Sequence, residues 1–203
     1  MNGDAEEKYN YFSIGVKPRK ATYSLNNDNI KINSQGSVLG TLSVSSYHLF
    51  NKVWATKFDI EYASATLVND YTYTETSFLL QSSYQKKFEQ IIFNFNSGVS
   101  LNKMTLIKST SANDINTSEL TLSAVHLGVI LKLNKKLHSH LFELNIGFGN
   151  INKTMFQYLW ERKARKHYAW YLGLGLINIK TKNDQEQISS EQQFISTGLK
   201  YAY

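Results

Sequence analysis

Histidine is the residue type in this sequence best suited to proton transfer near neutral pH, and the chain contains five. One hypothesis makes His126 a general base oriented by Glu143, as in a membrane-embedded hydrolase or acyltransferase. Such a site also needs a serine or aspartate nucleophile, and none is legible near a predicted strand end. We therefore expect no enzyme activity and no catalytic residues. We expect the charged side chains to form ion pairs instead, because an isolated buried charge costs several kcal/mol.

The sequence offers no metal or cofactor site. Without cysteine, the chain has neither thiolate ligands nor disulfides. Its carboxylates and histidines do not fall at ligand spacing, and no glycine-rich phosphate loop precedes a helix. The basic run 162–166 could suggest nucleic acid, but no stacking aromatic pattern surrounds it. We expect no metal, no cofactor and no nucleic-acid partner, and we interpret the basic run as a turn at a membrane surface.

The elements that position these side chains are predicted by alternation of apolar and polar residues. In one segment Trp54, Phe58 and Tyr62 alternate with Lys57 and Glu61, and a strand sends alternate side chains to opposite faces. The chain is also rich in aromatic residues and contains a single proline, which favours strands. The same reading predicts further strands near residues 9–17, 38–50, 77–84, 90–101, 124–132, 142–149, 154–161, 169–176 and 195–203.

Segment 154–161 is ambiguous. Phe156, Tyr158 and Trp160 alternate as in a strand, whereas Met155, Tyr158 and Leu159 also lie at helical spacing. We favour the strand because it gives ten strands with both termini on one side of a barrel. The alternative is an eight-stranded barrel in which this segment forms a short loop helix.

The connections between these strands fall into two classes. Tight, basic turns are predicted at residues 51–52, 86–87, 134–136 and 162–166. Longer polar loops are predicted at residues 18–35, 68–71, 102–118, 150–153 and 181–190. Short turns at one rim and long loops at the other are typical of an up-and-down antiparallel barrel.

A transmembrane barrel fits the residue inventory better than a soluble one. No run of 18 apolar residues could form a transmembrane helix. The apolar faces carry more large rings than the bore of a ten-stranded barrel can hold, while the other faces carry small and polar residues. We expect a lumen network made of Lys57, Asp59, Glu61, Glu75, His126, Lys132, Glu143, Glu161 and Lys200. We expect an aromatic girdle made of Trp54, Tyr84, Trp160, Tyr168, Trp170 and Tyr203.

The C-terminal residues 198–203, Gly-Leu-Lys-Tyr-Ala-Tyr, end a strand on an aromatic residue. With the alternation, this ending resembles the small outer-membrane β-barrel superfamily of Gram-negative bacteria, porin-like barrels of eight to ten strands. That family more often ends in phenylalanine. The resemblance implies a multi-pass protein of the bacterial outer membrane. It also implies contact with outer-membrane lipids and lipopolysaccharide, and recognition by the barrel-assembly machinery.

We expect residues 1–203 to form one barrel domain behind a flexible segment, residues 1–8. That segment is polar and acidic, unlike a signal peptide, so we expect an exported protein to be a mature chain with an added initiator methionine. The expected role is structural or interactive, with limited passage of small solutes through a largely plugged lumen. The alternatives are a lipid A-modifying enzyme or omptin-like protease in the membrane, and a soluble ligand-binding barrel.

The turn at residues 134–136 also predicts a register. A two-residue loop at 134–135 places His126 directly opposite Glu143. A loop at 135–136 places Glu143 opposite Gly128, one diagonal step from His126. We therefore expect His126 and Glu143 to be cross-strand neighbours.

Overall fold

A computed structural model describes residues 10–27, 31–67, 71–111, 114–135, 137–164, 167–181 and 186–203. The N-terminal segment 1–8 lies outside this range. No helix of the described chain is long and apolar enough to cross a membrane. The described strands are β1 (Tyr11–Val16), β2 (Arg19–Asn27), β3 (Lys31–Leu49), β4 (Trp54–Thr66), β5 (Tyr71–Phe88), β6 (Ile91–Ser111), β7 (Asp114–Asn134), β8 (His138–Gly149), β9 (Ile151–Lys163), β10 (Tyr168–Thr181) and β11 (Glu186–Ala202).

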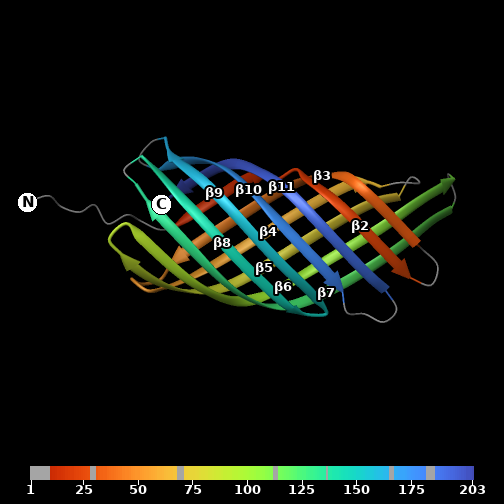
Figure 1. The fold of residues 1–203 in the computed structure, drawn as a ribbon, viewed down its shortest axis with the longest axis horizontal. Helices are drawn as coiled ribbons and strands as arrows, with labels where there is room; N and C mark the ends of the chain where they lie inside the picture. Colours follow the sequence, from red (N-terminus) through yellow and green to blue (C-terminus); the bar gives the residue numbers. More distant parts are fainter. Residues whose placement is uncertain are drawn as a thin grey trace, which may run out of the picture.

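These strands close into one antiparallel barrel (Figure 1). Strands β1 and β2 each pair with both β11 and β3, so they are two halves of a single strand of the wall. The break lies at Lys17 and Pro18, where proline has no N–H to donate to a ladder. Lys17 N–H still donates to Thr41 O (2.8 Å). The wall therefore has ten strands, as predicted, and the ambiguous segment 154–161 lies within β9.

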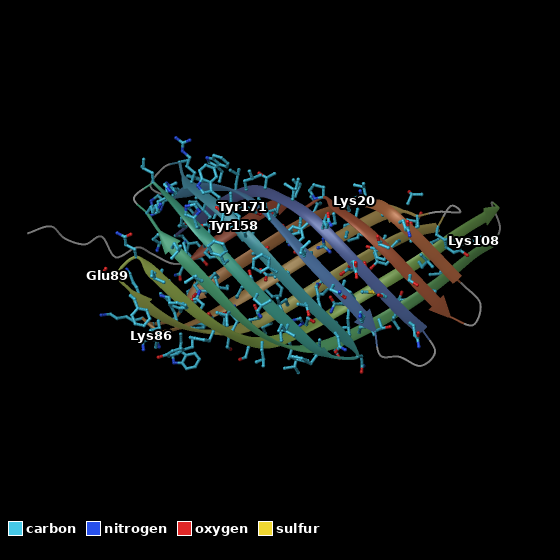
Figure 2. The ribbon with its side chains drawn as sticks, viewed as in Figure 1. Lys20, Lys86, Glu89, Lys108, Tyr158 and Tyr171 are labelled. Atoms are coloured by element: carbon cyan, nitrogen blue, oxygen red, sulfur yellow. The ribbon has the colours of Figure 1, made fainter. Side chains whose placement is uncertain are left out.

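We call the end of the barrel that carries Asn10 and Tyr203 the proximal end. Tyr203 N–H donates to Asn10 O (3.1 Å), which brings both ends of the described chain to this rim. Four turns lie at the same rim. The predicted turn at 86–87 was placed too early, because β5 runs to Phe88 and the turn is Glu89–Gln90, with Glu89 at φ 44°. Figure 2 shows Lys86 and Glu89 at this end.

The opposite, distal end differs from the expected rim of long loops. Residues 102–118 belong mainly to β6 and β7, which pair from Ile91 and Leu133 out to Ser111 and Asp114. Residues 19–27 form β2, and β3 begins at Lys31. Strand β9 begins at Ile151 and β11 at Glu186. The predicted loops at 18–35, 102–118, 150–153 and 181–190 are therefore largely strand, and Figure 2 shows Lys108 far out at the distal tip.

These segments were predicted as loops because the polarity of the two faces inverts along most of the long strands. On β7, outward Val125 and Leu127 are more than half exposed. Towards the distal end the outward residues become Ser123, Thr121 and Glu119, which are exposed and polar. The inward neighbours Leu122 and Ala124 are buried instead. A polar outer face with few apolar residues looks like a loop in sequence, although the alternation continues.

This inversion produces two apolar regions, one on the outside of the barrel and one inside it. The first is an exposed apolar band around the proximal half, defined by Phe12, Ile14, Leu42, Phe58, Phe78, Leu80, Phe95, Val99, Val125, Leu127, Phe142, Leu144, Phe156, Leu172, Leu174, Ile195 and Leu199. The second is a buried distal core inside the barrel, made of Ala21, Tyr23, Leu39, Ala63, Ala65, Leu67, Tyr71, Tyr73, Met104, Leu106, Leu122, Ala124, Ile151, Ile177, Ile179, Ile188 and Phe194.

Candidate functional site: the charged lumen and its cavity

The lumen inside the apolar band is polar, because the residues that alternate with the band point inward. Nearest the proximal rim, Glu161 is the centre of one cluster. It pairs with Lys200 (2.6 Å) and Lys132 (3.3 Å), and it accepts a hydrogen bond from Ser139 Oγ (3.0 Å). The Lys200 ammonium also lies 3.7 Å from the centre of the Tyr11 ring. Two cations and a hydroxyl thus offset the cost of burying one carboxylate.

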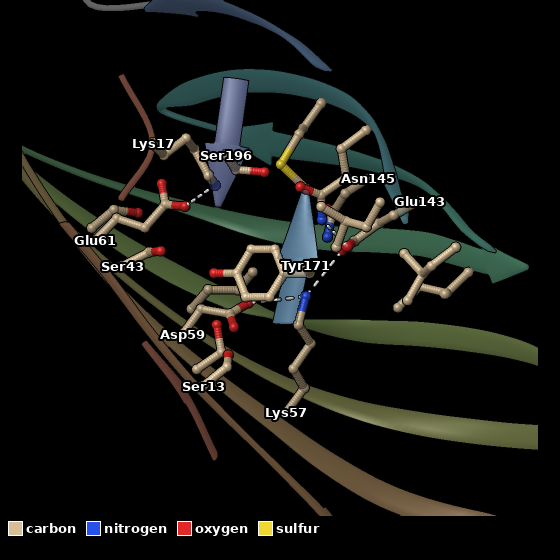
Figure 3. Close-up of a pocket in the computed structure, with 18 of the residues that line it drawn as sticks. Ser13, Lys17, Ser43, Lys57, Asp59, Glu61, Glu143, Asn145, Tyr171 and Ser196 are labelled. Carbon is tan, nitrogen blue, oxygen red and sulfur yellow. Dashed lines mark hydrogen bonds and ion pairs between the residues drawn. The ribbon is translucent and has the colours of Figure 1, made fainter. Parts of the chain in front are cut away.

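The second cluster is built around Lys57 on β4. Its Nζ lies 3.1 Å from Asp59 Oδ2 on the same strand and 3.1 Å from Glu143 Oε1 across the lumen. Gln157 Nε2 donates to the other oxygen of Glu143 (2.5 Å). Figure 3 shows Lys57 reaching between the two carboxylates. Strands on opposite walls, β4 and β8, are therefore joined through the bore.

The third cluster lies between these charges and the distal core. Glu61 pairs with both Lys17 and Arg19. Arg19 also lies 3.8 Å from Glu75 and donates to Gln192 Oε1 (3.1 Å). Glu75 in turn accepts a hydrogen bond from Tyr73 (3.2 Å), a member of the distal core. The ion pairs of this cluster and the distal core are therefore in direct contact.

His126 belongs to none of these clusters. Its Nδ1 lies 2.9 Å from Asn145 Oδ1, and its Nε2 lies 2.7 Å from Ser100 Oγ. The predicted neighbour Glu143 lies opposite Ile130, whereas His126 lies opposite Gly147. The register prediction was wrong because β7 and β8 keep pairing to Asn134 and Ser139, with Lys135 N–H donating to His138 O (2.8 Å).

A cavity of about 120 Å³ lies among these groups. Its lining includes Lys57, Asp59 and Glu143 of the second cluster, together with Ser100, His126 and Asn145. Glu61 and Lys17 of the third cluster and Glu161 and Lys200 of the first also border it. The cavity therefore borders all three charged clusters of the lumen.

All nine residues of the predicted lumen network point into the bore. The structure brings eight of them together in the three charged clusters and separates His126. It adds Lys17 and Arg19, which the sequence reading missed because its strand ended at residue 17, before Pro18. Their even spacing from Tyr11 and Ser13, which places all four side chains on the same face of a strand, was the signal that could have found them. It also adds Ser100 and Asn145, whose inward parity was visible but whose partner was not.

The six predicted girdle aromatics lie towards the proximal end of the barrel. Trp54 packs edge-on against Tyr84 (ring centres 5.3 Å apart) and Trp160 against Trp170 (4.8 Å). Tyr168 and Tyr203 both pack against Tyr201, at 5.1 Å and 6.4 Å. The described residues contain no group of three histidine, aspartate or glutamate side chains that could hold a metal ion.

No known protein-family profile matches the sequence, and no curated protein matches it. Solved structures do match. The outer-membrane protease OmpT from Escherichia coli has a TM-score of 0.59 at 7% identity, with 97% of each chain covered. The β-domain of the Bordetella autotransporter BrkA has a TM-score of 0.52 at 9% identity, with 96% of this chain and 98% of that chain covered. At this identity the similarity concerns the fold, and the chain has the fold of the small outer-membrane β-barrels.

Proposed function

We propose that the protein is an integral outer-membrane barrel whose bore is closed and whose distal half stands outside the bilayer as a surface for interaction. The single observation that carries this proposal is the inversion of polarity along the strands. An apolar outer face needs lipid, whereas a polar outer face over an apolar core needs water. One barrel that carries both, end to end, fits a molecule that is half immersed.

The dimensions of the apolar band support immersion of the proximal half. On β10 the outward apolar side chains run from Tyr168 to Leu176. That length is close to the roughly 9–11 residues that a tilted strand needs to cross a bilayer. The outward residues beyond it include the exposed Lys180. We assign this rim to the periplasmic side, because short turns lie on that side in such barrels.

Closure of the bore is proposed from two layers in series. The distal core fills the barrel with apolar side chains, including the rings of Tyr23 and Tyr73, whose centres are 4.9 Å apart. Below it, the three charged clusters link opposite walls. A hydrated solute would have to shed water to pass the core and break ion pairs to pass the lumen.

We further propose that the proximal aromatic residues contact outer-membrane lipid, and that the barrel-assembly machinery recognises the C-terminal strand β11. Lipopolysaccharide would surround the band on the distal side. Rings such as Trp54 and Trp170, apolar at one end and polar at the other, suit the headgroup level.

Conductance in planar lipid bilayers tests the closed bore. We expect the wild-type barrel to give no large, steady current. The double variant Tyr23→Ala with Tyr73→Ala removes two rings from the distal core and should conduct more than the wild type. A large steady wild-type current would show that the barrel is an open pore.

A further inference from the structure

Three lumen side chains outside the charged clusters form a linear hydrogen-bonded chain. Asn145 Oδ1 can only accept, so His126 Nδ1 donates to it and His126 Nε2 is left as the acceptor for the Ser100 hydroxyl. Asn102 Nδ2 donates to Ser100 Oγ (3.1 Å), which leaves the Ser100 hydrogen free to point at the imidazole. This is the order of groups and the tautomer that a serine nucleophile with a histidine base requires.

The barrel wall positions this chain on three adjacent strands. His126 on β7 lies opposite Gly98 on β6 and Gly147 on β8. Ser100 and Asn145 are each two residues from those glycines, which makes both diagonal neighbours of the histidine. A Cβ at Gly147 would lie 2.6 Å from His126 Cε1 and 3.0 Å from both ring nitrogens. The imidazole therefore lies across a position that only glycine leaves open.

The hydrogen-bonded side chains Ser100, His126 and Asn145 are buried but border the cavity. Ser100, His126 and Asn145 are 6%, 4% and 3% exposed, and all three line the cavity of about 120 Å³. Asn145 Nδ2 is buried without a hydrogen-bond partner, and Lys153 also lines the cavity. A hydrogen-bond donor and a cation thus border the cavity in which an ester carbonyl would lie, and groups of this kind stabilise a developing oxyanion.

We propose that Ser100 is a nucleophile activated by His126, that Asn145 is the positioning residue for the imidazole, and that the cavity accepts a small carboxylic ester. The cavity volume limits the substrate to a short acyl group and a small alcohol. Because the distal core closes the cavity on one side, the ester would enter from the proximal end, past the Glu161 cluster. That route suits a small uncharged ester, whereas the ion pairs oppose the large hydrated solutes considered above. This activity is additional to the surface role proposed above and does not depend on it.

The reaction is a two-step acyl transfer to water. Ser100 Oγ bonds to the acyl carbon while its proton moves to His126 Nε2, the ester C–O bond breaks, and the alcohol leaves with that proton. Water then bonds to the acyl carbon and gives a proton to His126. The acyl–Oγ bond breaks, Ser100 recovers the proton, and a carboxylic acid is released. No oxidant, reductant or metal enters the balance.

Methanesulfonyl fluoride, which is small enough for the cavity, tests the nucleophile in the folded, detergent-solubilised protein. Attack by a serine oxygen displaces fluoride and leaves a methylsulfonyl group, which peptide mass mapping locates. Ser77 is the internal control. It is also 6% exposed and lines the same cavity, but it donates to Asn102 Oδ1 (2.8 Å) and contacts no histidine in the hydrogen-bond network.

We expect modification of Ser100 and not of Ser77, at a rate that rises with pH as the imidazole loses its proton. His126→Gln should slow it by about a hundredfold or more, the usual contribution of a general base. Asn145→Ala should slow it by between about tenfold and 10⁴-fold, and Asn145→Asp should restore part of the rate.

Two results would overturn the proposal. One is modification of Ser100 no faster than that of Ser77, including no modification of either, a comparison within the wild type that needs no variant to fold. The other is an unchanged rate in a His126→Gln barrel that still shows heat-modifiable gel migration. Neither result would alter the bilayer conductance, so failure of this proposal is distinguishable from failure of the closed-barrel proposal.

Discussion

Substitution of Lys57 by methionine should destabilise the barrel strongly. The Lys57 ammonium lies 3.1 Å from Asp59 and 3.1 Å from Glu143, and the Glu143 side chain is 2% exposed. Without the Lys57 ammonium, the carboxylates of Asp59 and Glu143 lose the cation that they share in the lumen. Removing one member of a buried ion pair typically costs about 3–5 kcal/mol, and we expect Lys57→Met to fall in that range.

The matched control is Lys103→Met on the outer surface of the distal half. Lys103 pairs with Glu119 at 2.8 Å, but the two side chains are 50% and 49% exposed. Exposed pairs contribute about 0–1 kcal/mol because water screens them. The same substitution, at a shorter ion pair, should therefore cost several-fold less.

Urea unfolding in lipid vesicles, followed by tryptophan fluorescence, measures both effects through the midpoint and slope of the transition. The double variant Lys57→Met with Glu143→Met should recover part of the lost stability, because one of the unpaired carboxylates is gone. Equal losses for Lys57→Met and Lys103→Met, or no recovery in the double variant, would refute a lumen held by buried ion pairs.

Further predictions concern the outer face and the strand packing. Leu174→Arg in the apolar band should cost about 2–4 kcal/mol in lipid, whereas Thr74→Arg on the outward face of distal β5 should change stability little; urea midpoints compare the two. Gly198→Ala should destabilise the closure of β11 on β1, since a Cβ there would lie 2.3 Å from Ile14 O. Gly40→Ala, with no atom within 4 Å of its Cβ, should unfold at or above the wild-type urea concentration; the reverse order would contradict this packing.

Much of the wall could be predicted from sequence because alternation survives in every strand of the proximal half. The distal half could not, because there most outward residues are threonine, serine and charged residues, and the apolar residues lie mainly on the inward face. Met104 and Leu106 carried that signal on β6, between outward Lys103 and Thr105. The apolar and polar residues of the distal half still alternate with a period of two. The expectation of a loop obscured this pattern.

The inward set of the site could also be predicted, because parity decides which face a side chain occupies. Its contacts could not, because they depend on register between strands. Of the two predicted registers, the one closer to the structure placed Glu143 opposite Gly128, whereas Glu143 lies opposite Ile130, two residues further along β7. His126 therefore forms hydrogen bonds with Ser100 and Asn145 and not with Glu143. Interruption of a strand at Pro18 likewise hid Arg19, although it continues the wall.

We propose that one barrel wall passes from lipid to water where its polarity inverts. The chain contains no cysteine, so single cysteines can carry spin labels at outward positions of β7, two in the band (Leu127 and Val125) and two beyond it (Thr121 and Glu119). In lipid vesicles we predict that labels at the first pair collide mainly with oxygen and labels at the second pair mainly with a water-soluble nickel chelate. Equal access of the nickel chelate to labels at positions 127 and 121 would show that the wall does not pass from lipid to water between them.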